Sequence, residues 1–172
     1  MTLNSKLPLL GKTILLTRSH QQQKEFSSFF QNLGAQVLDL PVLLIGEPDD
    51  WGPLDQSLRK LDQFDWIIFS SGNGVQNVAI RMRKLGISLL NLRGKLKVAA
   101  VGQKTSKLLS DMGVHVDFVP PKFVSDSLIK DFPKDKQGLK LLIPRVQSGG
   151  RTILSEQFNK AGYEVVEVPA YE

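Results

Sequence analysis

Several residue types are missing or scarce in this 172-residue sequence, and each shortage excludes a kind of chemistry. The sequence has no cysteine, which excludes disulfide bonds, thiol nucleophiles and thiolate metal sites. It has only two histidines, His20 and His115, and their separation does not fit the spacing of metal ligands. No apolar run approaches the roughly 18 residues that a membrane-spanning helix needs. We therefore expect a cytoplasmic globular protein that has no metal site and no membrane partner.

The charge balance of the sequence does not identify a ligand. Lysine and arginine number 22 against 17 aspartates and glutamates, which gives a net charge of +5. This excess favours an acidic ligand, and it is equally typical of a lysine-rich surface. No cluster of lysine and arginine is interleaved with aromatic residues, so nucleic acid is not an expected partner.

Two stretches of the sequence repeat one pattern. Gly11–Pro41 and Gly138–Pro169 align at an offset of 127 residues, which becomes 128 after one inserted residue. Each copy reads as a strand, a loop with arginine, a helix, a glycine turn, a strand and a proline, and Arg18 is equivalent to Arg145. A repeat of a whole supersecondary segment indicates a duplicated architecture.

Apolar patterns predict an α/β fold with mostly parallel strands. Short runs rich in Ile, Leu and Val predict strands at Thr13–Leu16, Val37–Leu40, Trp66–Phe69, Lys97–Val101, Val116–Val119, Leu139–Ile143 and Glu164–Val168. Stripes at helical spacing predict helices at Gln22–Leu33, Pro53–Leu61, Val75–Leu85, Thr105–Met112 and Ile153–Phe158, each with a core-facing side. Continuously apolar strands that alternate with helices are typical of parallel sheets covered on both faces.

Four polar loops are placed where such a sheet binds ligands, at the carboxyl ends of strands. They are 17–20, 70–74, 102–105 and 144–151, and three of them contain glycine. Helix N-termini there would offer N–H groups and a partial positive charge to carboxylates or phosphates. The alternative is that their Ser, Thr and Asn residues only cap helices. None of the loops carries a nucleotide-binding glycine fingerprint.

At Phe69–Val75, Phe-Ser-Ser-Gly-Asn-Gly-Val, the sequence resembles the uroporphyrinogen-III synthase family. Further segments resemble that family in the same order: Ile14–Arg18, Ala99–Thr105, and Arg145 with Gly149–Arg151 followed by Pro169–Glu172. The resemblance covers essentially the whole chain from Gly11.

The resemblance implies flavodoxin-like parallel sheets in two lobes joined by a two-strand linker. Residues 1–40 would be the opening piece of lobe one, 41–44 a linker strand, 45–167 the complete lobe two, and 168–172 the return linker. Family members continue past this point, so lobe one would be incomplete in this chain. The family is expected to be monomeric, whereas a chain of this length is expected to pair or swap with a second copy.

The implied activity is that of a cofactor-independent lyase of tetrapyrrole biosynthesis, which leads to porphyrin, heme and chlorophyll. It would cyclise hydroxymethylbilane, a polycarboxylate, to uroporphyrinogen III with loss of water and inversion of the terminal pyrrole. The resemblance implies Tyr171 as the catalytic residue. It implies that substrate binds at Arg18, Ser70, Ser71, Asn73, Gly74, Gly102, Gln103, Thr105 and Arg145.

Other readings remain open from the sequence. One is a non-catalytic α/β module that binds an anionic ligand or regulates a partner. Another is the same synthase made inert by its incomplete lobe, and a third is half of a sugar-nucleotide transferase. A receiver domain is disfavoured, because Thr17 and Arg18 stand where it would need clustered acids.

Overall fold

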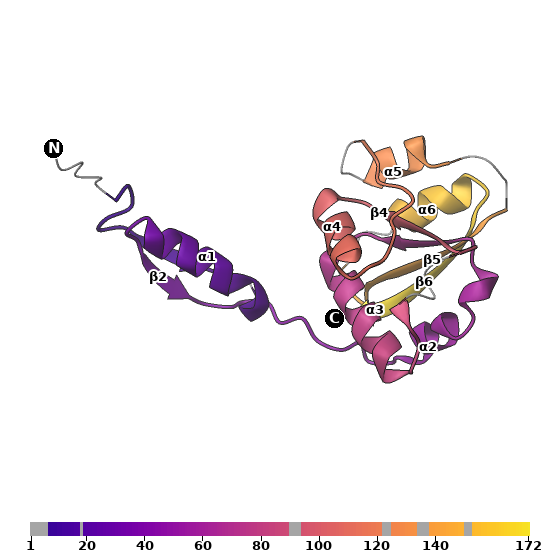
Figure 1. The fold of residues 1–172 in the computed structure, drawn as a ribbon, viewed down its shortest axis with the longest axis horizontal. Coiled ribbons are helices and arrows are strands. Elements are labelled where there is room, and N and C mark those ends of the chain that lie inside the picture. The colour runs from indigo at the N-terminus through magenta and orange to yellow at the C-terminus, as the bar shows by residue number, and fades with distance from the viewer. Residues whose placement is uncertain (1–6, 18, 90–93, 122–124, 134–137, 150–152) are drawn as a thin grey trace. The chain divides into compact units, whose positions relative to one another are not determined.

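The computed structural model describes residues 7–17, 19–89, 94–121, 125–133, 138–149 and 153–172. The chain forms two compact units, which we name unit 1 (Met1–Ile45) and unit 2 (Gly46–Glu172). Figure 1 shows that each unit combines helices with strands. Among the described residues, no helix is both long enough and apolar enough to cross a membrane.

Unit 1 is a single β–α–β segment. Its two strands, β1 (Thr13–Leu16) and β2 (Gln36–Asp39), pair in parallel, and α1 (His20–Asn32) connects them. A glycine, Gly34, follows α1 with a φ of 93°, which lies in the left-handed region that side chains disfavour. A Cβ at this position would lie 2.6 Å from the Cβ of Leu7, so the turn also has no room for a side chain.

Polar contacts hold α1 on one face of this small sheet. The amide Nε2 of Gln23 donates to the carbonyl oxygen of Leu16 at 3.3 Å. The hydroxyl of Ser27 donates to Asp39 Oδ1 at 2.9 Å. Both Gln23 and Ser27 are buried. Burying polar groups costs little when each has a hydrogen-bond partner, so these two contacts define the covered face.

The other face of the unit 1 sheet is apolar and exposed. Leu15 and Leu38 lie directly opposite each other in the register and are 54% and 50% exposed. The sequence predicts a core face for the phenylalanines of α1, but Phe29 is 57% exposed. The physical reason is width, because two strands provide too little surface to cover both the helix stripe and the far side of the sheet.

Unit 2 contains a four-stranded parallel sheet in the order β4–β3–β5–β6. Its strands are β3 (Trp66–Phe69), β4 (Lys97–Ala100), β5 (Lys140–Val146) and β6 (Glu164–Tyr171). Its helices are α2 (Gly52–Leu58), the 3-10 turn η1 (Leu61–Gln63), α3 (Gly72–Lys84), α4 (Gln103–Asp111), α5 (Ser125–Asp131) and α6 (Ile153–Lys160).

Helices cover both faces of this sheet, so β3 contributes side chains to two cores. Ile67 and Phe69 pack with α2, α3 and α4, whereas Trp66 and Ile68 pack with α5 and α6. Figure 1 shows α2 and α3 on one side of the sheet and α5 and α6 on the other. Alternation of side chains along a strand produces this division. Each fully buried side chain of this size stabilises the fold by roughly 1.5–3 kcal/mol.

The direction of the chain across the sheet reverses between β3 and β5. From β3 the chain moves outward to β4 and then to Phe118, which bridges Ala99 on the side away from β3. It then crosses back to β5 and β6 on the other side of β3. In open α/β sheets, ligands bind at such a switch point, in the crevice beyond the carboxyl ends of the strands.

The predicted α/β class with parallel strands is confirmed, and most predicted elements exist with shifted bounds. The predicted strand Val116–Val119 is reduced to the single bridge at Phe118. The cause is Asp117, whose Oδ2 accepts the backbone N–H of Val98 at 2.8 Å in place of a ladder carbonyl. The short helix α5 was not predicted, because it shows only one buried apolar turn around Leu128.

Candidate functional site

Two hydroxyl groups meet at the carboxyl edge of the unit 2 sheet. Ser71 follows the end of β3, and Tyr171 is the last residue of β6. Their side-chain oxygens lie 3.1 Å apart, and either one can donate the hydrogen bond. One hundred residues separate them in the sequence. They are brought together because β3 and β6 lie on the two sides of β5 and end at the same edge of the sheet.

Ser71 also caps the helix that starts there. It is the N-cap of α3, with extended backbone angles, and its Oγ accepts the N–H of Gly74 at 3.1 Å. A serine hydroxyl has two lone pairs and one proton, so this bond leaves it free to exchange a hydrogen bond with Tyr171. The helix N-terminus carries partial positive charge, which favours negative charge that develops on either oxygen.

The remaining residues of this loop differ in their accessibility. Ser70 is exposed, Asn73 is half-buried, and Gly74 is buried. A Cβ on Gly74 would lie 3.6 Å from the carbonyl oxygen of Pro144, an ordinary contact distance. Gly74 therefore lies against the end of β5, whereas Ser70 and Asn73 retain surface that a ligand can reach.

A second helix begins at the same edge of the sheet, and its start is more open. Gly102, two residues after the end of β4, is the N-cap of α4 and supplies no side-chain cap. No atom lies within 4 Å of the position that a Cβ would occupy there. Gln103 is exposed and Thr105 is 6% exposed. The first N–H groups of α4 lack intrahelical carbonyl partners, which makes this terminus suitable for an anion.

The two candidate arginines lie in different situations. Arg145 Nη1 is 3.0 Å from each carboxylate oxygen of Glu167 on the neighbouring strand, and its side chain is 15% exposed. Its charge is therefore already neutralised by a structural partner. Arg18 lies outside the residues that the structure describes.

The adjacent acids Asp49 and Asp50 have separate roles. Their place in the sequence predicts that both mark the start of a helix. Asp50 fits this prediction, since its Oδ1 accepts the N–H of Gly52, the first residue of α2, at 2.7 Å. Asp49 instead forms two hydrogen bonds with Gln147, 98 residues away. No local pattern in the sequence signals this pair.

A charged pair fixes α2 against α3 behind the site. Arg81 Nε and Nη2 donate to the two carboxylate oxygens of Asp55 at 2.6 and 2.5 Å, and the guanidinium lies 4.8 Å from the centre of the Trp51 ring. The hydrogen bonds from Arg81 hold the pKa of Asp55 below its usual range, and those to Asp55 raise the pKa of Arg81. This pair is a structural contact between helices.

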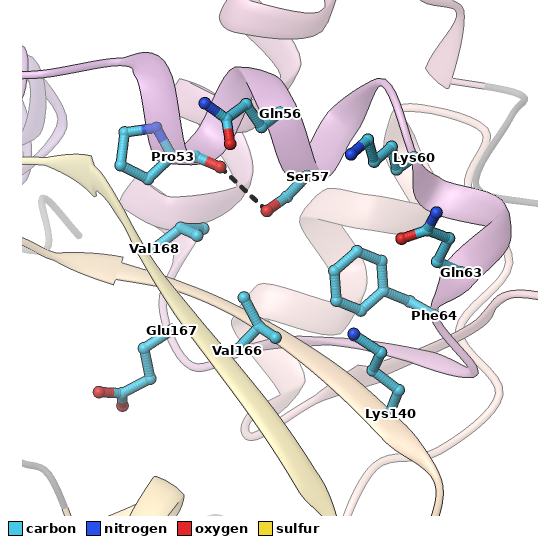
Figure 2. A pocket seen from close by; sticks show the side chains of 10 residues that line it. All are labelled: Pro53, Gln56, Ser57, Lys60, Gln63, Phe64, Lys140, Val166, Glu167 and Val168. Carbon is cyan, nitrogen blue, oxygen red and sulfur yellow. Dashed lines mark hydrogen bonds between the residues drawn. The ribbon is translucent and has the colours of Figure 1, made fainter.

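A hollow of about 290 Å³ lies between α2 and β6, away from the carboxyl edge (Figure 2). Lys140, the first residue of β5, lies at its rim and forms an ion pair with Glu164 at 2.6 Å. Figure 2 shows Glu167 directed away from the hollow, in agreement with its bond to Arg145. Its glutamines and Lys60 are exposed. None of the predicted site residues that the structure describes lines this hollow.

Within the described ranges, no group of three or more His, Asp or Glu side chains is arranged to bind a metal ion.

Known proteins resemble this chain over most of its length. The family model for uroporphyrinogen-III synthase HemD matches residues 24–172. The uroporphyrinogen-III synthase of Synechococcus elongatus is 41% identical over 165 residues, which are 96% of this chain and 62% of that protein. The uroporphyrinogen-III synthase of Chlorobaculum parvum is 27% identical over 162 residues, which are 94% of this chain and 63% of that protein. The chain thus spans about three fifths of the length of these relatives.

The fold has a solved counterpart. The crystal structure of a mutant uroporphyrinogen III synthase from the extremely thermophilic bacterium Thermus thermophilus superposes with a TM-score of 0.71 at 20% identity, and covers 94% of this chain and 62% of that one. At this identity the likeness concerns the fold alone. The family match over residues 24–172 includes β3, the loop that follows it and the end of β6. The chain belongs to the uroporphyrinogen-III synthase family.

Proposed function

We propose that this chain carries the catalytic hydroxyl pair of a uroporphyrinogen-III synthase, which cyclises hydroxymethylbilane to uroporphyrinogen III with loss of water and inversion of the terminal pyrrole. The observation that carries the proposal is the 3.1 Å contact between Ser71 and Tyr171 at the carboxyl edge of the sheet. It lies at the switch point of the strand order, where ligands bind in sheets of this kind.

In this proposal, Tyr171 donates its phenolic proton to the hydroxyl group that leaves the substrate. The carbon–oxygen bond breaks, water departs, and the phenolate that remains accepts a hydrogen bond from Ser71. The N-terminus of α3 beside Ser71 stabilises this negative charge. Closure of the ring releases a proton from the substrate, and this proton returns to Tyr171, so that the residue is unchanged after one turnover.

We assign the substrate's carboxylates to the loops that start α3 and α4. The open N-terminus at Gly102, Gln103 and Thr105 offers backbone N–H groups without a competing cap. At the start of α3, the carboxylates would be bound by Ser70, Asn73 and Gly74. Binding by backbone amides would hold the chain of pyrroles in a ring-closing shape, and positioning of this kind lowers the barrier in addition to the proton transfer from Tyr171.

Arginine takes a smaller part in this scheme. Arg145 of β5 is paired with Glu167 of β6, so we assign it to holding these two strands together and not to direct attraction of a carboxylate. Arg18 stays a candidate from the sequence. The absence of a cofactor and the cytoplasmic location likewise stay proposals, which rest on the family.

A second candidate function is that of an anion-binding module without catalysis. It is favoured by the open N-terminus of α4, which can bind a carboxylate whether or not a reaction follows. The two functions differ in the product that they predict.

The test is to add hydroxymethylbilane to the purified chain and to separate the uroporphyrinogen isomers after oxidation. The synthase proposal predicts more type III isomer than in a control without protein, in which the type I isomer forms spontaneously. Formation of type I alone, together with saturable binding of the substrate, would instead support the binding module. Type I alone without binding would contradict both.

A further inference from the structure

The last residues of β6 depart from regular strand geometry. The register between β5 and β6 shifts after Arg145, so that Arg145 pairs with Pro169 but Val146 pairs with Tyr171. Ala170 is thereby an extra residue on β6, as in a β-bulge. Successive residues of a regular strand face opposite sides of the sheet. Here, however, Ala170 and Tyr171 both pack against the same core, the one formed with α2, α3 and α4.

The bulge therefore determines where the Tyr171 side chain points. Along β6, Val166, Val168 and Ala170 face the core that α3 covers. Without the extra residue, alternation would direct Tyr171 to the opposite face, away from Ser71. Because bulges bend a strand and redirect side chains, the irregularity at Ala170 accounts for the contact between the two hydroxyls.

One residue of the loop after β5 holds the bulged segment in place. The backbone N–H of Gln147 donates to the carbonyl oxygen of Tyr171 at 2.8 Å. The side chain of the same residue bonds Asp49 twice. Its Nε2 donates to Asp49 Oδ2 at 2.6 Å, and its Oε1 accepts the N–H of Asp49 at 2.7 Å. Gln147 thus links Tyr171 to the segment that leads into α2.

The next residue, Ser148, takes part in a similar link between the end of β6 and the segment that leads into α2. The backbone N–H of Ser148 donates to Glu172 Oε2 at 2.9 Å, and its hydroxyl bonds the other carboxylate oxygen. Glu172 and Gly46 exchange two backbone hydrogen bonds, at 2.6 and 3.0 Å. Two separate segments, 46–49 and 171–172, are therefore both fixed by Gln147 and Ser148.

We infer that Gln147 is a positioning residue for Tyr171: its paired hydrogen bonds with Asp49 lock the bulged end of β6, so that the phenol stays on Ser71. The inference rests on the proposed function for its catalytic meaning, whereas its structural content is independent of it. The hydrogen bonds of Gln147 go to Asp49 and to the backbone of Tyr171, so it acts through that backbone. It belongs to the polar loop 144–151, but its partner Asp49 could not be named from the sequence.

The test exchanges the two partners. Gln147→Glu sets a carboxylate against that of Asp49, which removes the donor and adds repulsion. Asp49→Asn together with Gln147→Glu restores a donor opposite an acceptor, with their order reversed, and leaves the backbone bonds possible. Asp49→Asn alone completes the double-mutant cycle, and the interaction energy from that cycle isolates the pair from unrelated effects of each substitution. Gln63→Glu, on an exposed glutamine of η1, is the matched control.

The first readout is the signal of the Tyr171 ring in NMR of chain labelled at its tyrosines. The chain has two tyrosines, and Tyr163→Phe assigns the remaining ring signal to Tyr171. We expect Gln147→Glu to shift or broaden this signal, the double variant to return it to the original position, and Gln63→Glu to leave it unchanged. An unmoved signal in a folded Gln147→Glu chain, or a double variant that does not recover, would overturn the inference.

The second readout is turnover, which separates this inference from the proposed function. Misplacing Tyr171 should lower kcat roughly tenfold and change KM by less than about threefold, because the substrate's carboxylates bind elsewhere. The double variant should regain most of this loss. If the ring signal responds as expected but the unaltered chain makes no type III isomer, the positioning link stands and the proposed function fails. Equal loss of kcat in the single and double variants would count against the link.

Discussion

Unit 1 and unit 2 contain the two copies of one repeated sequence pattern, yet the copies are buried to very different degrees. In the repeat, Leu15 of β1 corresponds to Leu142 of β5, and these side chains are 54% and 0% exposed. Phe30 of α1 is half-buried, whereas the equivalent Phe158 of α6 is fully buried. Both copies share the same pattern of apolar residues. The pattern therefore indicates which side chains can be buried, but it does not determine whether they are buried.

The difference comes from the neighbours of each copy. β5 has a strand on either side, and helices cover both faces of its sheet. β1 pairs with β2 on one side, and α1 covers one face of the pair. A β–α–β segment completes its core only when further strands and helices pack against it. The following predictions test this contrast between the units, from the largest expected effect to the smallest.

Phe158→Ala should destabilise unit 2 far more than Phe30→Ala. Removal of a fully buried phenylalanine typically costs about 3–5 kcal/mol, because it also leaves a cavity. Both tryptophans, Trp51 and Trp66, lie in unit 2, so tryptophan fluorescence in a denaturant titration reports unit 2 alone. We expect the midpoint to fall sharply for Phe158→Ala and to stay unchanged for Phe30→Ala. Equal shifts for both variants would show that the units do not unfold separately.

Charges on the open face of unit 1 should suppress association between chains. Leu15 and Leu38 form an exposed apolar pair, and such patches promote contact between molecules. We expect the chain to associate in a concentration-dependent manner in sedimentation experiments, and Leu15→Lys with Leu38→Lys to shift it toward the monomer. Ile80→Lys, at a 49% exposed position on α3, is the control and should have little effect. A chain that stays monomeric at all concentrations would contradict this expectation.

The equivalent glycines Gly34 and Gly162 should differ in their tolerance of alanine. Both have a positive φ, of 93° and 87°, and placing an alanine in this conformation destabilises the fold by about 1–2 kcal/mol. Only Gly34 is also crowded, since its Cβ would lie 2.6 Å from Leu7, whereas Gly162 has open space. Hydrogen exchange of the backbone amides should therefore accelerate more in β1 and β2 for Gly34→Ala than in β5 and β6 for Gly162→Ala. The reverse order would mean that Leu7 moves aside at no cost.

The bond between Asp55 and Arg81 should make the stability of unit 2 depend on acid pH. The pKa of Asp55 is lower in the folded chain than in the unfolded chain, so the unfolded chain binds the proton more readily. The stabilisation is complete above the ordinary aspartate pKa of about 4 and is lost as the pH falls through the lower folded value. Because the pair is partly exposed, we expect at most about 1 kcal/mol. Asp55→Asn should be less stable than the parent chain at pH 6, and this difference should shrink as the pH falls below the ordinary aspartate pKa of about 4.

The sequence predicts which helices and strands unit 2 contains better than it predicts where each of them begins and ends. Its apolar runs and glycines define β3, β5 and most helices, because local patterns and turn chemistry agree there. They fail at Val116–Val119, where the side chain of Asp117 replaces a backbone acceptor. They also cannot show that α1 presents Gln23 and Ser27 to its sheet, since these bonds depend on distant partners.

The candidate site divides in the same way. The loop after β3 and Tyr171 are visible as motifs, and Ser71 as a helix cap follows from its place before α3. The contact of Ser71 with Tyr171, the bulge at Ala170 and the link between Gln147 and Asp49 are not visible, because each joins residues that are far apart in the sequence or depends on one extra residue in a strand. Long-range register of this kind is set by packing across the sheet and leaves no local signal.

The most direct test of the proposed catalytic pair compares the only two tyrosines of the chain. Tyr171→Phe removes the hydroxyl that meets Ser71, whereas Tyr163→Phe keeps an aromatic ring beside Phe132 and Phe158. We would measure the initial rate of type III isomer formation from hydroxymethylbilane for both variants. We predict that Tyr171→Phe lowers kcat by about 10²-fold with little change in KM, and that Tyr163→Phe retains turnover. A Tyr171→Phe chain that turns over at the rate of the Tyr163→Phe chain would contradict the assignment of Tyr171 as the catalytic residue.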